Sequence, residues 1–185
     1  MAAPLEPAQM RTYFALTEAV SLLQHAVQQQ LQAEGGLSYV QFEILAKLVD
    51  AGRALSMTEL ADGVVYSRSG LTHQAALLEN SGLITRHSDP RDQRATLVEI
   101  TAEGRDRVAR VLPGHIQVVR RLLFDPLSDQ DVATLGDIMS RALQQMRALP
   151  PRSAVPRRRG SPGPRSRPRG PPAARGGARA RERVG

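Results

Sequence analysis

The feature that most constrains the fold is the stretch from residue 55 to residue 101, where two short helical segments precede two strand-like segments. The helical segments cover residues 58–63, with a predicted cap at Thr58, and residues 67–80, and the tight sequence GVVY joins them. These lengths are typical of a helix-turn-helix. The sequences LITRHS and ATLVEI then have the patterning of strands. We therefore expect a brief extended piece, a helix-turn-helix and then a two-stranded hairpin.

The connection between the two strands, DPRDQR, is dense in charge. Asp89 and Pro90 fit the first two positions of a type I turn, so we expect a stiff tip. Arg91 and Arg94 are too exposed at such a tip to stabilise the fold much as ion pairs. A stiff hairpin that carries arginine can instead enter the minor groove of DNA, where the potential is negative. We expect Asp89 and Asp92 to hold these arginines in one rotamer through charge-assisted hydrogen bonds.

The second short helix has an apolar side and a polar side. Leu71, Ala75 and Leu78 repeat at the spacing of an inward-facing stripe, and Gly82 ends the helix. The predicted outward set suits base edges and phosphates in a major groove, and it comprises Ser67 as N-cap, Arg68, Ser69, Thr72, His73 and Gln74. A solvated polar face is the alternative interpretation, and the hairpin downstream favours DNA binding.

Longer helices flank this region. Residues 8–33 carry an apolar stripe made by Tyr13, Leu16, Val20, Leu23 and Val27, widened by Phe14, Leu22, Ala26 and Leu31. A shorter helix begins after a capping box of Ser38 and Gln41 and ends at Gly52. Together these patterns predict a mainly helical chain of the α+β class.

Two more helices are predicted after the hairpin. Residues 102–124 contain Pro113, so we expect a kink there. Residues 129–149 follow a capping box at Ser128 and keep heptad spacing through Val132, Leu135, Met139, Ala142, Met146 and Leu149. The apolar faces of the first and last helices favour burial against a second copy of the chain. The alternative is that the first, fifth and sixth helices cover one another within one chain.

Composition divides the chain into two parts. Residues 150–185 contain 11 Arg and one Glu among Pro, Gly, Ala and Ser, a net charge of +10, which leaves −3 of the total of +7 for residues 1–149. We expect the tail to be disordered, because it has too few apolar side chains to offset its chain entropy. The alternative function is therefore a non-specific binder of nucleic acid or another anionic partner that acts through this Arg-rich tail.

The sequence lacks the residues that several classes of function require. The sequence contains no Cys, no G-x-S-x-G, no glycine-rich phosphate loop and no H-E-x-x-H motif, so we expect no enzyme and no cofactor. His25, His73, His87 and His115 fall on separate segments, which argues against a metal site. Apolar runs are too short to span a membrane and no signal peptide is evident, so we expect a cytoplasmic protein without a membrane partner.

The order of elements resembles the MarR family of winged-helix transcriptional regulators over residues 8–149. The most specific part is Asp92-x-Arg94 followed by Ile100-Thr101 and Gly104, supported by Ser67-x-Ser69, Leu78-Glu79 and Gly82-Leu83. The resemblance implies a winged helix-turn-helix with long dimerisation helices at both ends and a two-stranded wing. It also implies a homodimer that binds a palindromic operator in double-stranded DNA, most often as a repressor, and releases it on binding a small aromatic or phenolic effector.

The same resemblance assigns roles to individual residues. It makes Arg94 the minor-groove arginine with Asp92 as its orienter, and places Ser67, Arg68, Ser69, Thr72 and Gln74 in the major groove. His73 departs from the pattern, since Arg or Lys is common there. For an effector pocket between the first, second and fifth helices we select His25, Tyr39 and Phe42, with ordinary core or boundary positions as the alternative. His115 is expected on the helix surface.

Overall fold

The computed structural model describes residues 3–64, 68–90, 92 and 94–148. Its elements follow the order α1 (Pro7–Gly35), α2 (Tyr39–Ala51), β1 (Leu55–Ser56), α3 (Met57–Gly63), α4 (Arg68–Asn80), β2 (Ile84–Ser88), β3 (Thr96–Ile100), α5 (Ala102–Val119), the π-helical turn η1 (Arg120–Phe124) and α6 (Asp129–Arg147). This is the mainly helical α+β architecture with a wing that the sequence predicted. The Arg-rich tail lies outside the described residues.

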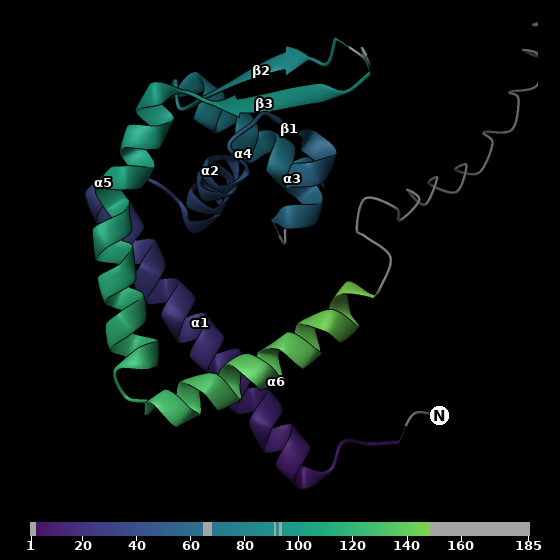
Figure 1. The fold of residues 1–185 in the computed structure, drawn as a ribbon, viewed down its shortest axis with the longest axis vertical. Coiled ribbons are helices and arrows are strands. Elements are labelled where there is room, and N and C mark those ends of the chain that lie inside the picture. The colour runs from purple at the N-terminus through teal and green to yellow at the C-terminus, as the bar shows by residue number, and fades with distance from the viewer. Residues whose placement is uncertain (1–2, 65–67, 91, 93, 149–185) are drawn as a thin grey trace, which may run out of the picture. The chain divides into compact units, whose positions relative to one another are not determined.

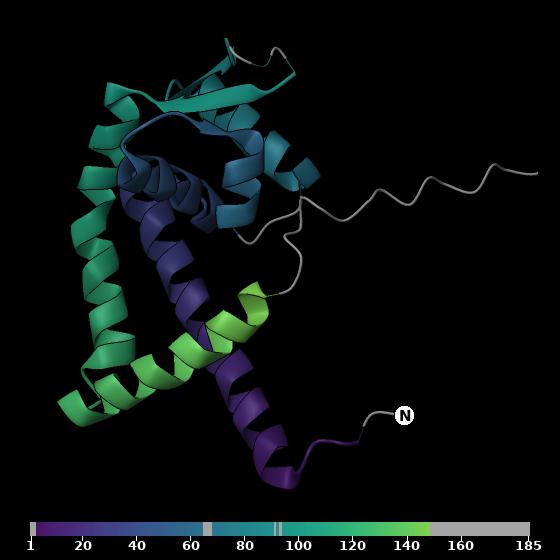
Figure 2. The ribbon, with the colours of Figure 1, turned by 45° about the vertical axis from the view of Figure 1, so that its right-hand side comes forward.

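Helices α2, α3 and α4 pack beneath a small antiparallel sheet, and α1 and α5 extend side by side away from it (Figure 1). Turning the molecule shows the same pairing of α1 with α5, with α6 at the end remote from the sheet (Figure 2). The helix-turn-helix with its hairpin therefore lies at one end of this unit and α6 at the other, and α5 runs from one to the other.

The sheet has the order β1-β3-β2, so the predicted extended piece at residues 55–56 adds a third strand to the hairpin. Leu55 pairs with Val98, and Ile84 pairs with Ile100 at the base of the hairpin. Val98 and Ile100 are buried, whereas Glu99 is exposed, which confirms the predicted alternation of β3. Because β1 holds β3 from one side, β2 is left as an edge strand.

The core lies where α2, α4, α5 and the sheet meet. Its fully buried side chains include Leu31, Ile44, Leu45, Leu48, Leu60, Leu71, Leu78, Leu83, Ile84 and Val98. The inward stripe predicted for α4 is confirmed, because Leu71, Ala75 and Leu78 are all at most 1% exposed. Helix α4 is therefore held in the core by one apolar face, and its opposite face remains exposed.

The stripe predicted for α1 is buried only at its C-terminal end. Val27 and Leu31 are in the core, but every residue from 4 to 22 is exposed, including Phe14 at 59% and Leu22 at 64%. Within the described chain, the N-terminal half of α1 extends beyond the elements that could cover it. The pattern correctly identified an apolar face, and the single chain buries only the C-terminal part of that face.

The cap predicted for the short helix α3 was wrong by two residues. Ser56 is the N-cap, since its Oγ accepts a hydrogen bond from the Glu59 N–H at 3.2 Å and the Glu59 carboxylate accepts one from the Ser56 N–H at 2.7 Å. Thr58 is an exposed residue inside the helix. The sequence holds two hydroxyl residues here, and only Ser56 has Glu three positions later, as a capping box requires.

Helix α5 contains Pro113 and continues to Val119, where the π turn η1 follows. There the N–H of Asp125 donates to the carbonyl of Arg120 at 2.8 Å. The capping box at Ser128 is confirmed for α6. No residue within Asp129–Arg147 is buried, and the predicted final position of the heptad, Leu149, lies outside the described residues.

Candidate nucleic-acid interface

Helix α4 presents three of the predicted residues to solvent, namely Ser69, Thr72 and His73. They lie on one face because positions three and four apart are neighbours on a helix. Arg68 begins the helix, and Ser67 lies outside the described residues. The hydrogen-bonding side chains of Ser69, Thr72 and His73 leave room for a base edge to approach the helix.

Gln74 is placed differently from the rest of the predicted set. It lies three residues after Leu71 and four before Leu78, so it stands at the edge of the inward stripe. Its side chain is half-buried, and within the described chain its Oε1 atom is shielded from solvent without a hydrogen-bond partner. The prediction treated every polar residue of the first turns as outward-facing, although helical spacing separates Gln74 from the others.

The hairpin tip is closed by a short set of hydrogen bonds. The Asp89 N–H donates to the Ala95 carbonyl at 2.9 Å, and the Ala95 N–H donates to the Asp92 carbonyl at 2.8 Å. The Asp92 carboxylate accepts a hydrogen bond from the backbone N–H of Arg94 at 3.0 Å. In the structure Asp92 thus fixes the backbone under Arg94, where the sequence predicted that it would hold the guanidinium.

The side chain of Arg94 is exposed at this tip, as predicted. Arg91 and Gln93 lie outside the described residues, so the turn predicted at Asp89 and Pro90 remains a prediction. A turn braced by Asp92 limits the backbone freedom of an exposed arginine. An arginine held in this way can enter a narrow groove with little loss of entropy.

The wing is also joined to α4 by an ion pair that was not predicted from the sequence. The Glu79 carboxylate, at the end of α4, accepts hydrogen bonds from Arg86 on β2, at 3.2 Å from the backbone N–H and at 2.8 Å from Nε. Arg86 Nη2 makes a further ion pair with Glu79 Oε2. This partner holds the pKa of Glu79 below its usual value. The signal was two opposite charges seven residues apart, on either side of a helix-to-strand turn.

The turn after α4 is joined to the start of α5. Thr101 caps α5, since its Oγ1 accepts a hydrogen bond from the Gly104 N–H at 3.0 Å, and the same hydroxyl donates to the Gly82 carbonyl at 2.7 Å. The Thr101 N–H donates to the Leu83 carbonyl at 3.1 Å. Gly104 is buried against this carbonyl. The recognition-helix candidate and the long helix α5 therefore meet at one tightly packed joint.

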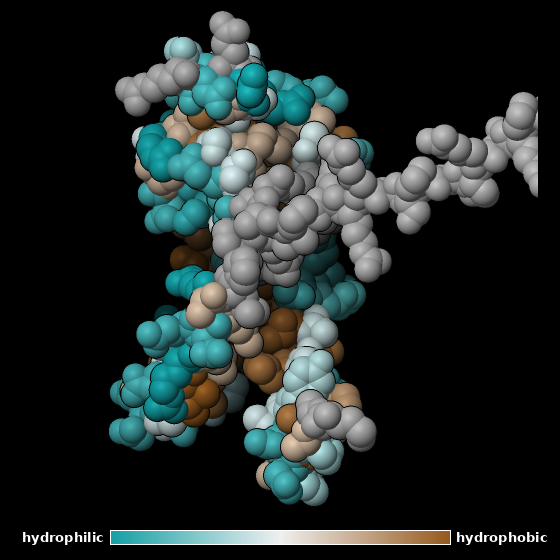
Figure 3. All heavy atoms as spheres, turned by 90° about the vertical axis from the view of Figure 1, so that its right-hand side faces the viewer, coloured by the Kyte–Doolittle hydropathy of each residue, from teal (hydrophilic) through white to brown (hydrophobic). Residues whose placement is uncertain are grey.

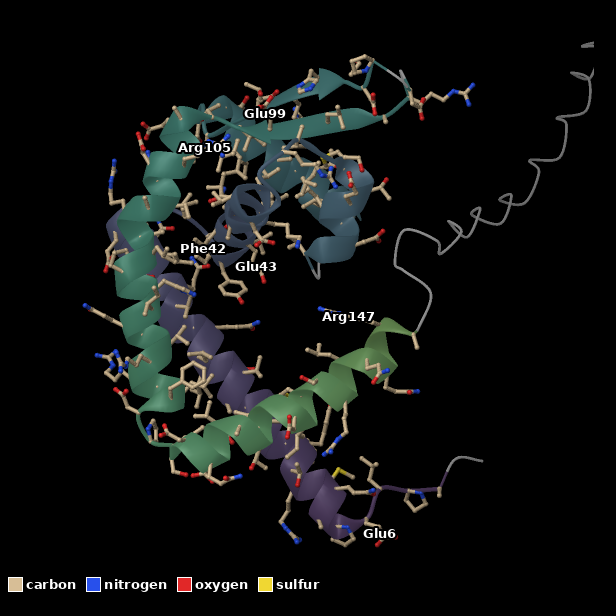
Figure 4. All side chains as sticks on the ribbon, in the orientation of Figure 1. Glu6, Phe42, Glu43, Glu99, Arg105 and Arg147 are labelled. Carbon is tan, nitrogen blue, oxygen red and sulfur yellow. The ribbon has the colours of Figure 1, made fainter. Side chains whose placement is uncertain are left out.

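The three residues selected for an effector pocket have different surroundings. Phe42 is a core residue at 7% exposure and packs on the ring of His115, with the ring centroids 4.8 Å apart, as its position between α2 and α5 in Figure 4 illustrates. Tyr39 is half-buried and hydrogen-bonded to Glu43. His25 is exposed and contacts Gln29 of its own helix at 3.0 Å. The structure brings Phe42 to His115 and leaves His25 on the surface of α1.

His115 is half-buried, which corrects the expectation of a surface residue. Burial lowers the pKa of its imidazole, and within the described chain its Nδ1 atom is shielded and has no hydrogen-bond partner. It lines a mostly apolar pocket together with Ile116, Val119, Arg120 and Phe124. Nearby on α2, burial raises the pKa of the Glu43 carboxyl, and the hydrogen bond to Tyr39 offsets part of that rise.

A second apolar hollow lies among the long helices. It is lined by Leu16, Ala19, Val20, Leu22 and Leu23 of α1, Leu122 and Leu123 of η1, and Leu135 and Met139 of α6. We call this set the helix groove. Figure 3 shows apolar surface at this end of the molecule, in the lower half of the view.

Across residues 3–64, 68–90, 92 and 94–148 no three His, Cys, Asp or Glu side chains gather in a way that could hold a metal ion. In the same part of the chain, each helix is too short or too polar to cross a membrane.

Comparison with known proteins addresses the DNA-binding reading directly. Residues 35–95 match the model of the MarR family. The chain is 30% identical over 143 residues to the HTH-type transcriptional repressor YetL of Bacillus subtilis, an alignment that covers 75% of this chain and 85% of YetL. The chain belongs to the MarR family.

Solved structures of MarR proteins agree with this assignment. Sco3205 of Streptomyces coelicolor, a MarR family transcriptional regulator solved in complex with DNA, has a TM-score of 0.74 and 33% identity, covering 78% of this chain and 91% of Sco3205. BpsR of Bordetella bronchiseptica, whose DNA binding is regulated by 6-hydroxynicotinic acid, has a TM-score of 0.65 and 21% identity, with 76% and 97% covered, and shows the shared fold. This MarR protein is a DNA-binding transcriptional regulator.

Proposed function

We propose that this chain is a cytoplasmic, homodimeric repressor that binds a palindromic operator through paired α4 helices, with Arg94 of each wing in a flanking minor groove. The observation that carries this proposal is the exposed face of Ser69, Thr72 and His73, which lies on the helix directly before a braced arginine tip. Two recognition helices related by a two-fold axis read half-sites about one helical turn apart, roughly 34 to 36 Å.

The operator proposal is tested by footprinting on DNA upstream of the gene. We expect two protected half-sites related by two-fold symmetry. Arg94→Ala should weaken binding by about 1 to 3 kcal/mol, the scale of a groove contact. Arg110→Ala, which removes an exposed arginine from α5, is the matched control and should leave affinity unchanged. Asymmetric protection, or equal effects of the two substitutions, would refute this mode of binding.

The helix groove supports the homodimer. Apolar residues on the exposed half of α1, on η1 and on α6 gather in one place, and Val20 and Leu22 remain 44% and 64% exposed. An apolar surface of this kind is characteristic of a protein interface. A second copy of the chain presents the same surface, so a two-fold arrangement buries both at once.

Mass measurement by light scattering tests the dimer. Leu22→Asp should give a monomer, because Leu22 is exposed in the single chain and its replacement disturbs no single-chain core contact. Val49→Asp, which changes a residue of 42% exposure on α2 outside the groove, should leave the dimer intact. A dimeric Leu22→Asp variant would show that the groove is not the interface.

For the effector we propose a small aromatic or phenolic molecule in the pocket beside His115. The apolar walls suit an aromatic ring, and His115 and Arg120 supply polar groups at its edge. The DNA binding of BpsR, which has the same fold, is regulated by an aromatic acid. The proposed pocket is lined by α5 and η1, whereas the predicted residues lie on α1 (His25) and α2 (Tyr39 and Phe42). Of the three, Phe42 contacts a residue of this pocket, His115.

A panel of hydroxybenzoates provides the test. We expect at least one member to release operator DNA from the wild-type protein and to have no effect on His115→Ala. His25→Ala should respond like the wild type, because His25 is exposed and contacts only its own helix among the described residues. If the effector still releases operator DNA from His115→Ala but not from His25→Ala, the effector site lies beside α1 instead.

The Arg-rich tail is the second candidate for DNA contact, on the ground of its charge of +10. A binder that acts through the tail alone would bind any sequence with a steep dependence on salt. Truncation after Leu149 would then abolish binding. Our proposal instead expects the truncated chain to keep its operator, with the tail adding affinity but little sequence preference.

A further inference from the structure

We propose that Glu79 is a positioning residue for DNA binding, which holds the wing at a fixed distance from the recognition helix through Arg86. This inference rests on the proposed function of α4 and the wing. It concerns how α4 and the wing are held relative to each other, and it gives a role to a charge pair outside the predicted set of DNA-contacting residues.

The edge of β2 explains why a carboxylate is needed there. In the sheet order β1-β3-β2, only one side of β2 is paired with a strand. The N–H of Arg86 points to the other side, where it donates to Glu79 Oε1 at 3.2 Å. Glu79 therefore takes the place that a neighbouring strand would occupy, and it satisfies an edge donor that would otherwise meet only water.

The same carboxylate also fixes the side chain of Arg86. Its second oxygen accepts from Nε at 2.8 Å and pairs with Nη2, so both oxygens of Glu79 are used by one residue. The side chains are only 27% and 33% exposed. A charge-assisted contact with this geometry is more directional than a single ion pair on the surface.

Because of its position along β2, the Glu79–Arg86 contact influences where the hairpin tip lies. Ile84, at the base of the hairpin, is buried and needs no further anchor, whereas His87 and Ser88 beyond Arg86 are exposed. Arg86 pairs with Val98, which β1 holds in the core from the opposite side. Glu79 thus joins α4 to β2 at the level of Val98, one residue before Leu97, where the pairing of β3 with β1 ends on the side of the tip.

The test is a double-mutant cycle of operator binding with Glu79→Gln and Arg94→Ala in the full-length chain. Glutamine keeps one acceptor for the Arg86 N–H but loses the charge and the second acceptor. We expect Glu79→Gln to weaken binding about tenfold in the wild-type background, and less than about twofold when Arg94 is already Ala. Glu103→Gln, which breaks the Arg107 pair on α5, is the matched control and should not change affinity.

A readout that separates positioning from stability is hydroxyl-radical footprinting. Glu79→Gln should lose protection at the flanking minor grooves and keep protection of the major-groove half-sites. An equal tenfold loss in both backgrounds, or no loss in the wild type, would overturn the inference. If Glu79→Gln unfolds, the charge-reversed pair Glu79→Arg with Arg86→Glu takes its place, and its minor-groove protection must exceed that of Arg86→Glu alone. Failure of the wild type to bind any operator would instead refute the proposed function.

Discussion

Substituting Gly104 by alanine tests whether the joint between the turn after α4 and the start of α5 is as tightly packed as it looks. A Cβ at Gly104 would collide with the Leu83 carbonyl oxygen and would lie 2.8 Å from Ile100 Cγ1 and 3.1 Å from the Leu83 carbonyl carbon. A backbone carbonyl cannot rotate away as a side chain can. The strand and the helix must therefore separate.

The expected cost follows from what separates. Overpacking a buried site costs about 1 to 3 kcal/mol, and the two hydrogen bonds from Thr101 to Gly82 and Leu83 contribute about 1 kcal/mol each. Alanine recovers about 0.5 to 1 kcal/mol of helix propensity. We expect a net loss of about 2 to 4 kcal/mol, which lowers the Tm by about 5 to 15 °C in a chain of this length.

Two other helical glycines supply matched controls. Gly136 on α6 has no atom within 4 Å of its hypothetical Cβ, so Gly136→Ala should raise the Tm by the propensity gain alone. Gly114 on α5 meets only the ends of the Glu34 and Gln30 side chains, which can move, so Gly114→Ala should fall within about 1 kcal/mol of the wild type. The measurement is thermal unfolding followed by circular dichroism at one protein concentration. If Gly104→Ala is as stable as Gly136→Ala, the joint is not packed as described.

Two further outcomes are expected in the same assay. Ser56→Ala should cost about 1 kcal/mol by removing the cap that Glu59 completes, whereas Thr58→Ala should cost nothing, and the reverse order would restore Thr58 as the cap. Glu43→Gln should stabilise the protein at neutral pH, because burial raises the pKa of Glu43 and so penalises its charged form in the folded state. Because the pKa of Glu43 is higher in the folded chain than in the unfolded chain, the wild type is most stable relative to Glu43→Gln in acid. This relative stability is lost as the pH rises through the folded pKa of Glu43. An advantage of Glu43→Gln that persists unchanged below about pH 4 would contradict this account.

The sequence predicted the elements better than it predicted their ends and their partners. Apolar spacing and capping boxes are local signals, so α2, α4, β3 and α6 could be recognised from a few residues each. The role of Ser56 was missed because two hydroxyl residues compete two positions apart. Gln74 was misplaced because a polar side chain was taken as evidence of an outward position.

Contacts between distant segments were the part that sequence could not supply. His115 lies 73 positions after Phe42, and only the packing of α5 on α2 shows that their rings meet. The Glu79–Arg86 pair is closer in sequence, but its geometry depends on Gly82, whose φ of +72° turns the chain back toward α4. The sequence pattern shows that Glu79 and Arg86 carry opposite charges, and the turn at Gly82 brings the two side chains together.

The π turn at residues 120–124 has a consequence for how this chain can vary in length. A π turn closes its hydrogen bond one residue later than an α turn, so it takes up one additional residue while the residues after it stay in phase. η1 is the last turn of α5 before the connection to α6. A one-residue deletion within η1 would therefore convert it to an α turn and be absorbed there. The same deletion within α5 would rotate every later residue by about 100° about the helix axis and carry Leu135 and Met139 away from Leu16 and Leu23.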